Sequence, residues 1–278
     1  EDKPANYEMA KLMCQRAFQA GADLILFPEM SFTGFSMNMK KVAEKYPYES
    51  VAKMKLLSEK YSHMAIGFGY ASYVKENISE EIRNCLEVVS NGESLMRYEK
   101  IHPFTFGEEG KHITAGSRLA ACEIHGVQIG GFICYDLRFP EPFQISSKKN
   151  EFIFVIANWP KERAEHWKLL LQARAVENQC YIAGINRIGE GGGLSYEPGS
   201  MVFNPLGNPV KGRFYRVASE DGGCEGVRVE KGCCEIGKDE GFLLVEIDTE
   251  VVWNVRKNFP LKADRREALY KQWYMENQ

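Results

Sequence analysis

The residue with the clearest chemical potential is Cys134, which ends an apolar run and precedes a charged segment. The run 127–133 predicts a buried strand, and Pro140 suits the first turn of a following helix. At a strand-to-helix turn, backbone amide groups are expected to favour the thiolate of a cysteine, which is its nucleophilic form. A lone cysteine is more often a buried structural residue. The position of Cys134 at a strand end favours a catalytic nucleophile.

A thiolate that attacks a carbonyl or nitrile carbon needs a proton acceptor and a positive group beside the developing oxyanion. None of the five histidines has an obvious claim to be the base, although His102 and His112 lie in a polar loop and stay open as candidates. Glu29 follows a short apolar run and would be partly desolvated, which suits a group that exchanges protons. Lys100 follows the predicted strand 94–99 and can supply the positive charge.

Three separate segments resemble the catalytic motifs of the nitrilase superfamily of carbon–nitrogen hydrolases. They are residues 26–30 around the glutamate, 98–102 around the lysine and 131–141 around the cysteine. Residues 158–160 and 174–179 are similar to segments that follow in the same order in that family. The resemblance covers nearly the whole chain and is strongest to the ω-amidase-like branch.

The resemblance implies a role for each matching residue. Cys134 would be the nucleophile, and Glu29 would be the general base and acid. Lys100 and the backbone N–H of Tyr135 would stabilise the tetrahedral oxyanion. The family carries no metal and no organic cofactor, and none is expected here.

A second glutamate of the family lies in the loop between the lysine and cysteine motifs. The resemblance implies that this residue is Glu109, with Glu108 as the alternative, although loop carboxylates are usually only solvated. Arg174 and Glu177 lie three residues apart on a predicted helix, so we expect them to pair with each other rather than to act on substrate. The residues predicted to line the substrate pocket are Tyr135, Phe104, Trp159 and Arg138. The three aromatic residues could equally belong to the core, and Arg138 could instead be held in a structural ion pair.

The resemblance further implies hydrolysis of a small linear amide through a thioester, with an ω-amide of a 2-oxo dicarboxylic acid as the expected substrate. Arg138 and Arg163 are candidate cations for the substrate carboxylate. A nitrilase or an N-carbamoyl amino acid hydrolase is the alternative within the family. A catalytically inactive binding or scaffold relative is a third hypothesis, against which the intact Glu29, Lys100 and Cys134 argue. The sequence leaves the exact substrate open.

The order of predicted elements indicates the fold class. Strands alternate with helices, and several strands are apolar throughout, which is typical of α/β proteins whose sheets are covered by helices. Helices are expected at 4–20, 47–61 and 161–177. No Pro-rich linker interrupts the chain, so residues 1–278 are expected to form one carbon–nitrogen hydrolase domain. The resemblance makes the fold more specific, as a four-layer α-β-β-α sandwich (nitrilase-like fold).

Composition argues against several classes of partner. The net charge of −3 gives no basic footprint for nucleic acid and no polybasic patch for a membrane surface. No apolar stretch approaches the roughly 18 residues that a membrane span needs. Eight cysteines, several inside apolar runs, favour a reducing compartment, so a cytoplasmic location is expected. Expected partners are a small amide and, from the resemblance, a second subunit in a homodimer or higher homo-oligomer.

Two features depart from the family pattern. Family members open with a strand before the first helix, whereas this chain begins at Glu1, already at the approach to that helix, and whether a strand precedes it is open. The segment 211–240 is longer than expected, and we interpret it as a surface hairpin that serves as a lid or a subunit contact. Its cysteines lack the spacing of a zinc site, so no metal is expected there: they are Cys224, Cys233 and Cys234.

Overall fold

One half of the protein is built on a four-stranded sheet of order β1–β2–β3–β4. In it, β1 (Leu24–Leu26) runs parallel to β2 (Ala65–Glu76), and β3 (Ser79–Ser90) and β4 (Glu93–Glu99) follow antiparallel. The computed structural model describes residues 2–36, 38–76, 79–107, 109–217, 227–229 and 240–276.

The other half is built on a five-stranded sheet of order β11–β8–β7–β6–β5. Its three central strands are parallel, and the two edge strands run antiparallel to their neighbours. Every residue of the middle strand is buried, as expected for a strand covered on both faces. The strands are β5 (Ala121–Ile124), β6 (Val127–Ile133), β7 (Phe152–Ala157), β8 (Tyr181–Asn186) and β11 (Met201–Phe203).

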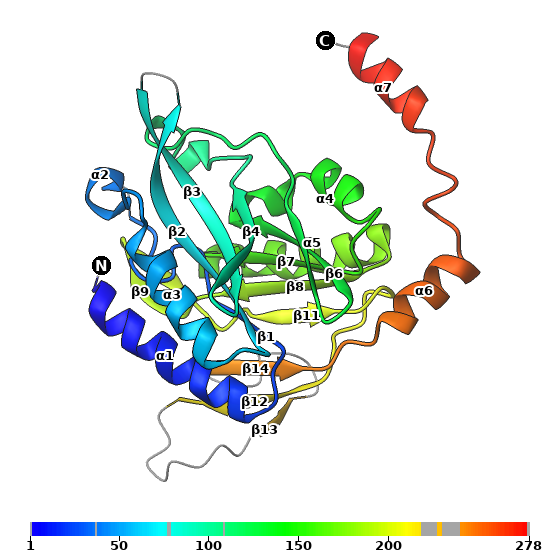
Figure 1. Cartoon of the computed structure of the whole chain (residues 1–278). Coiled ribbons are helices and arrows are strands. Elements are labelled where there is room, and N and C mark those ends of the chain that lie inside the picture. The colour runs from blue at the N-terminus through cyan, green and yellow to red at the C-terminus, as the bar shows by residue number, and fades with distance from the viewer. Residues whose placement is uncertain are drawn as a thin grey trace.

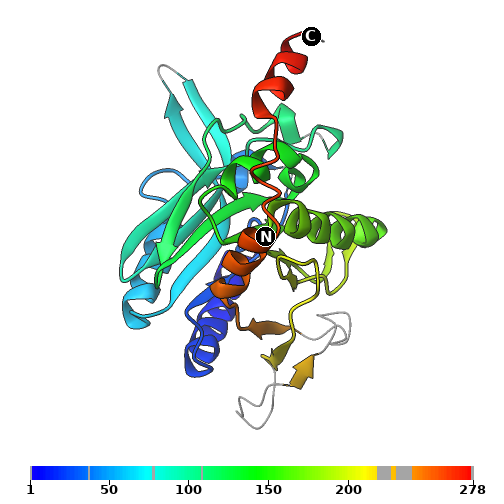
Figure 2. The same ribbon diagram turned by 90° about the vertical axis from the view of Figure 1, so that its right-hand side faces the viewer.

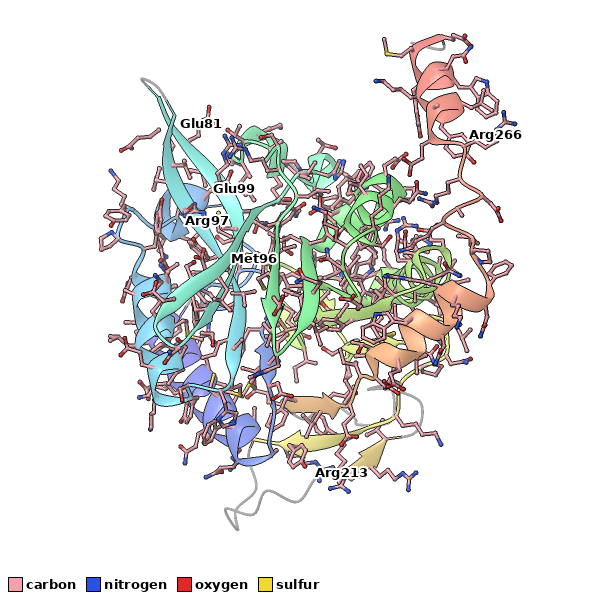
Figure 3. The ribbon with its side chains drawn as sticks, turned by 45° about the vertical axis from the view of Figure 1, so that its right-hand side comes forward. Glu81, Met96, Arg97, Glu99, Arg213 and Arg266 are labelled. Atoms are coloured by element: carbon pink, nitrogen blue, oxygen red, sulfur yellow. The ribbon has the colours of Figure 1, made fainter. Side chains whose placement is uncertain are left out.

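The two sheets pack face to face, and their facing side chains form one hydrophobic core. Leu86 and Met96 of the first sheet would come within about 3 Å of a side chain at Gly131 of β6, so this glycine lets the sheets approach closely. Met96 is labelled on β4 in Figure 3. Phe132 and Phe154 of the second sheet belong to the same core.

Helices cover the outer faces of both sheets, as Figures 1 and 2 show. α1 (Lys3–Gln19) and α3 (Glu49–Lys60) pack on the first sheet through a second apolar cluster. α4 (Pro140–Ser146) and α5 (Ala164–Asn178) cover the other sheet. The four-layer α-β-β-α arrangement is therefore confirmed. The predicted helix 161–177 begins instead as a 3₁₀ turn, η4 (Lys161–Arg163), before α5.

The sequence did not predict several smaller elements. α2 (Met39–Val42) is a single helical turn, and β9 (Gly189–Gly191) pairs with β10 (Leu194–Tyr196) in a hairpin beside the second sheet. The hairpin expected within residues 211–240 corresponds to the antiparallel pair β12 (Gly212–Arg216) and β13 (Val227–Val229), and β14 (Gly241–Val245) adds a third antiparallel strand to this small sheet. Cys224, Cys233 and Cys234 lie outside the described residues, so the absence of a metal there stays a prediction.

The chain continues into α6 (Thr249–Asn258) and α7 (Glu267–Glu276). Figures 1 and 2 show α7 at the end of an extended segment, standing away from the sandwich. Among the helices that the structure describes, none is long and apolar enough to cross a membrane.

Candidate active site

Strand register brings polar residues to one edge of the second sheet. Ile133 at the end of β6 pairs with Ile156 of β7, and the next residue of β7, Ala157, pairs with Asn186 at the end of β8. Cys134 therefore follows its strand at the same edge where Asn158 follows the neighbouring strand. The carboxyl ends of parallel strands are where ligand sites form in α/β folds.

Glu29 reaches the same edge from the first sheet. It follows β1 in a tight turn whose next residue, Met30, has a left-handed φ of 47°. A side chain at Gly69 would lie 2.6 Å from the Met30 nitrogen and 2.9 Å from the Glu29 Cα, so only glycine leaves room for this turn against β2. Ser31 fastens the turn by donating to the Pro28 carbonyl at 2.6 Å.

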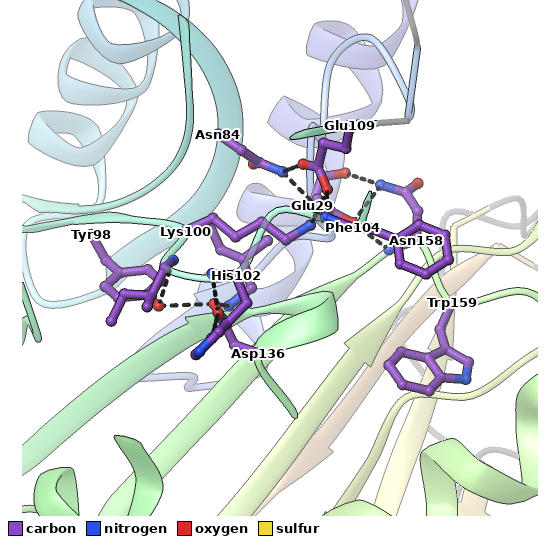
Figure 4. Close-up of polar contacts among 12 residues, drawn as sticks. Glu29, Asn84, Tyr98, Lys100, His102, Phe104, Glu109, Asp136, Asn158 and Trp159 are labelled. Carbon is purple, nitrogen blue, oxygen red and sulfur yellow. Dashed lines mark hydrogen bonds and ion pairs between the residues drawn. The ribbon is translucent and has the colours of Figure 1, made fainter. Parts of the chain in front are cut away.

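The Glu29 carboxylate is buried and surrounded by hydrogen-bond donors (Figure 4). Its Oε1 accepts from Lys100 Nζ at 2.9 Å and from Asn84 Nδ2 at 2.8 Å. Its Oε2 accepts from the backbone N–H of Asn158 at 3.0 Å. Four lone-pair positions on two oxygens are thus largely satisfied, which fixes the orientation of the carboxylate.

Lys100 and Glu109 complete this buried cluster. Lys100 Nζ donates to Glu109 Oε2 at 2.8 Å, and Glu109 also accepts from the Phe104 N–H at 2.7 Å and from Asn84 Nδ2 at 2.9 Å. Both side chains are sealed from solvent. Burial alone would lower the pKa of Lys100, but the charges of Glu29 and Glu109 outweigh it and hold this pKa well above 10.5. The alternative carboxylate, Glu108, lies outside the described residues.

Cys134 begins a five-residue 3₁₀ helix, η3 (Cys134–Arg138), and adopts a left-handed φ of 45°. Such a conformation costs about 1–3 kcal/mol for a residue with a side chain and is typical of functional turns. The residue is partly exposed, and its thiol is close enough to the Glu29 carboxylate for that charge to raise its pKa.

The electrostatics of Cys134 correct the expectation that the turn favours its thiolate. Burial, followed by the charge of Glu29, raises the pKa of the thiol well above its usual value, and Lys100 offsets this only in part. One short 3₁₀ turn does not compensate for a cluster of two carboxylates and one ammonium. The resting thiol is therefore protonated, with a carboxylate in place to accept its proton.

Asp136 joins the turn that carries Cys134 to the strand that carries Lys100. This buried carboxylate accepts from Tyr98 Oη at 2.8 Å and from the Ile133 N–H at 3.1 Å. It also accepts from the backbone N–H of His102 at 2.9 Å and lies 2.8 Å from His102 Nδ1. The His102 ring stacks on Phe139 at 3.8 Å. These contacts hold His102 in a structural role beside the site rather than as its base.

A cavity of about 1290 Å³ reaches the site, and its lining includes Glu29, Phe104 and Asn158. Of the four residues predicted to line the pocket, Phe104 is among the lining residues of this cavity. Tyr135 packs edge-on against Phe104 at 5.0 Å. Trp159 is buried, and the guanidinium of Arg138 lies 4.8 Å from its ring centroid.

The expected pairing of Arg174 with Glu177 is confirmed by an ion pair of 2.9 Å. Arg174 also donates to the Leu137 carbonyl at 2.8 Å, so it stabilises the 3₁₀ turn that begins at Cys134. Arg163 lies over the rings of Phe104 and Phe106, 5.7 Å from each centroid.

Two residues with many contacts in the site, Asn84 and Asp136, were not assigned a role from the sequence. Asn84 lies on the same face of β3 as Leu86 and Val88, both of which are buried between the sheets. A polar residue at a position where the alternation of the strand predicts an apolar one is the sequence signal that could have identified Asn84 as a site residue.

Comparisons with known proteins agree with this geometry. Residues 1–214 match the family model described as carbon–nitrogen hydrolase. The chain is 30% identical over 253 residues to 2-oxoglutaramate amidase of Bacillus subtilis (strain 168), which covers 90% of this chain and 87% of that protein. It is 34% identical over 191 residues to the omega-amidase YafV of Escherichia coli (strain K12), covering 68% and 72% of the two chains.

A solved structure gives the same fold. XC1258 of Xanthomonas campestris, a CN-hydrolase superfamily protein with an arsenic adduct in its active site, superposes with a TM-score of 0.72. The match covers 95% of this chain and 92% of that one, at 26% sequence identity.

Proposed function

Since this chain belongs to the carbon–nitrogen hydrolase family, we propose that it hydrolyses ω-amides of small 2-oxo dicarboxylic acids through a thioester on Cys134. The similarity to 2-oxoglutaramate amidase, which extends over 90% of the chain, supports this substrate class. The observation that carries the chemistry is the sealed contact of Glu29 with Lys100, next to the thiol of Cys134.

In the first half of the proposed reaction, the Cys134 thiol passes its proton to Glu29 as the sulfur attacks the amide carbon. The carbonyl oxygen becomes an oxyanion. Lys100 has three N–H donors, and the acceptors found for it among the described residues, Glu29 and Glu109, take two of them. The third donor and the backbone N–H of Tyr135 stabilise the oxyanion. Glu29 then protonates the nitrogen, the C–N bond breaks, and ammonia leaves with a thioester behind.

In the second half, water attacks the thioester carbon. Glu29, now ionised again, takes a proton from the water, and the C–S bond breaks to release the carboxylic acid. The sulfur recovers a proton from Glu29, which restores the resting site. Glu109 keeps Lys100 charged and in place throughout, because it adds a second negative charge at 2.8 Å.

The alternative activities within the family, nitrile and N-carbamoyl hydrolysis, use the same three groups. The hypothesis of an inactive scaffold relative is harder to reconcile with the site. A lysine sealed between two carboxylates costs desolvation free energy that a purely structural core would avoid, and such clusters concentrate at catalytic sites.

The test is a measurement of ammonia release by the purified protein from 2-oxoglutaramate, simple nitriles and N-carbamoyl amino acids. We expect 2-oxoglutaramate to give the highest kcat/KM. Cys134→Ala should abolish turnover with little change in thermal stability, because the substitution removes only one small group. If nitriles or carbamoyl amino acids are cleaved at least as well, the ω-amidase proposal is wrong although the thiol hydrolase mechanism stands.

We further propose that residues 1–278 act as one cytoplasmic domain that assembles as a homodimer. The support for a reducing compartment is that the cysteines of the described residues are free thiols: Cys14, Cys85, Cys122, Cys134 and Cys180. The support for assembly is the apolar surface of α6 and α7, where Trp253, Trp273 and Tyr274 are each at least half exposed. Light scattering should give a dimer, and removal of α7 should give a monomer.

A further inference from the structure

We propose that Arg187 holds the carboxylate of the substrate and so selects carboxylated amides over neutral ones. This inference rests on the proposed function, because it names the group of that same site that recognises the far end of the substrate. The sequence offered Arg138 and Arg163 for this task.

The register of the second sheet places Arg187 beside the site. Asn186, at the end of β8, pairs with Ala157, so Arg187 is level with Asn158, whose backbone N–H binds Glu29. Asn186 is fixed there, because its side chain accepts from the Trp159 N–H at 2.8 Å and donates to the Trp159 carbonyl at 2.9 Å. Two strand spacings separate β8 from the strand of Cys134, or roughly 10 Å.

The guanidinium of Arg187 is held in a defined place. It lies 4.6 Å from the ring centroid of Tyr196 and donates to the Glu190 carbonyl at 3.0 Å. A side chain at Gly34 would lie 2.9 Å from Nη1, and one at Gly191 would lie 3.1 Å from it. The two glycines therefore leave the space that the guanidinium fills. A cation positioned in this way loses little conformational entropy when it binds an anion.

The charge of Arg187 is available to a ligand. Within the described part of the chain, no carboxylate lies within 4.0 Å of its guanidinium, and the contacts found for it are carbonyl oxygens and a ring face. Arg187 lines the same cavity as Glu29 and Asn158. Tyr196, which lies under the guanidinium, also lines that cavity. Burial raises the pKa of Tyr196, the charge of Arg187 lowers it and the charge of Glu29 raises it, so this ring is close to both the arginine and the site.

The other two arginines are placed less favourably. Arg138 lies over the face of Trp159, and Arg163 lies over Phe104 and Phe106. Arg187 lines the cavity together with Glu29 and Asn158, whereas Arg138, Arg163 and also Cys134 are not among its lining residues. An arginine suits this task because its planar fork matches both oxygens of a carboxylate.

The distances suit a small ω-amide of a dicarboxylic acid. Its carboxylate carbon lies on the order of 5 Å from its amide carbon when the chain is extended. If the amide carbon lies at the Cys134 sulfur and the substrate extends along the sheet edge toward β8, roughly 5 Å remain to that strand, a distance that an arginine side chain can span.

The experiment compares two amides of equal length, succinamate and the neutral pentanamide. We expect Arg187→Gln to raise KM for succinamate by roughly 10- to 100-fold, the loss typical of a hydrogen bond to a charged group. It should leave kcat for succinamate and kcat/KM for pentanamide nearly unchanged. The Gln amide ends where the Arg187 Nε stands, so the variant keeps a donor near the Ile188 carbonyl and loses the one to the Glu190 carbonyl; the rate on pentanamide shows whether the hairpin β9–β10 still supports the site.

Two further variants complete the design. Arg187→Lys keeps the charge but loses the fork, so KM for succinamate should rise by a smaller factor; an unchanged KM would overturn the inference even if the Gln variant fails to fold. Arg213→Gln is the matched control, because Arg213 is an exposed residue of β12 on the separate small sheet (Figure 3).

The outcomes separate the two proposals. Equal loss of activity on both amides in Arg187→Gln would mean that Arg187 only supports the hairpin. If Arg187→Gln keeps the wild-type preference for succinamate, the inference about Arg187 is wrong while the proposed function stands. Wild-type protein that shows no preference for succinamate over pentanamide would overturn both.

Discussion

The hydroxyl of Tyr98 donates a 2.8 Å hydrogen bond to Asp136, and this bond ties the strand before Lys100 to the turn that begins at Cys134. Tyr98 lies on β4 of the first sheet and Asp136 lies in the 3₁₀ turn that follows β6 of the second, so the bond fixes the position of Lys100 relative to Cys134. Asp136 keeps three other donors when this one is removed, from Ile133 and from the backbone and ring of His102.

Tyr98→Phe should therefore lower kcat by roughly tenfold or more, because Lys100 and Cys134 would no longer be held in the correct relative position; KM should change little. The substitution should also lower the free energy of unfolding by about 1–3 kcal/mol. Tyr70→Phe is the matched control, because Tyr70 donates to the buried Glu87 at 3.0 Å elsewhere on the first sheet. Steady-state kinetics and urea unfolding of both variants check the prediction. A similar loss of kcat in the two would refute a positioning role for Tyr98.

Glu29→Gln should abolish turnover and at the same time lower the pKa of the Cys134 thiol. Burial and then the charge of Glu29 raise that pKa, whereas Lys100 lowers it, so removal of the Glu29 charge leaves the ammonium less opposed. The rate of alkylation of Cys134 measured against pH gives the pKa directly. An alkylation profile shifted to higher pH in the variant would contradict the electrostatic account.

Glu109→Gln should lower kcat by on the order of 10²-fold, because Lys100 loses one of its two charged partners and is held less firmly at the oxyanion. Glu108→Gln should leave kcat unchanged. This pair of single variants distinguishes the two loop glutamates directly by activity. A larger loss of kcat in Glu108→Gln than in Glu109→Gln would show that Glu108, and not Glu109, is the second glutamate of the site.

Stability should fall at alkaline pH because of buried thiols. Burial raises the pKa of Cys14 to about 12 and is the main cause that raises that of Cys180 to about 12, against an ordinary value of 9.0. Between about pH 9 and pH 12 the unfolded state has lost protons that the folded state still holds, so the free energy of unfolding decreases as pH rises. The contribution of these thiols is fully present below pH 9.

Replacement of both residues by Ala should make this decrease less steep, although the variant is less stable at neutral pH because of the cavities it creates. Val51→Ala, which truncates an apolar side chain of the same cluster as Cys14, should keep the wild-type slope. Urea unfolding at several pH values under reducing conditions measures the slopes. Equal slopes in all three proteins would show that other groups dominate the alkaline loss.

The sequence was sufficient to predict the residues that stand at strand ends. Glu29 and Cys134 each follow an apolar run, and Lys100 follows the predicted strand 94–99, so the local pattern predicts a strand and a polar position beyond it. The helices α1 and α3 were predicted to within two residues at each end, because their apolar spacing is local information too.

Contacts between segments that are distant in sequence were not predicted. Asn84 bridges Glu29 and Glu109 only because β3 lies between the segments that carry them, and no local pattern reports this pairing. Arg187 became a candidate through strand register, which places it level with Asn158. The thiolate expectation for Cys134 was wrong for the same reason, since the burial that mainly raises the pKa of its thiol, and then the charge of Glu29, come from segments far along the chain.

The bond from the Asn158 N–H to Glu29 spans 129 positions of the chain, and the ion pair of Lys100 with Glu29 spans 71. Contacts of such long range form late when a polypeptide folds, because a large loop must close before they contribute. A refolding chain can therefore regain its helices and its local hairpins before it contains any catalytic group in place. The enzymatic activity that returns during refolding therefore reports the docking of the two sheets, the step that brings the residues of the site together.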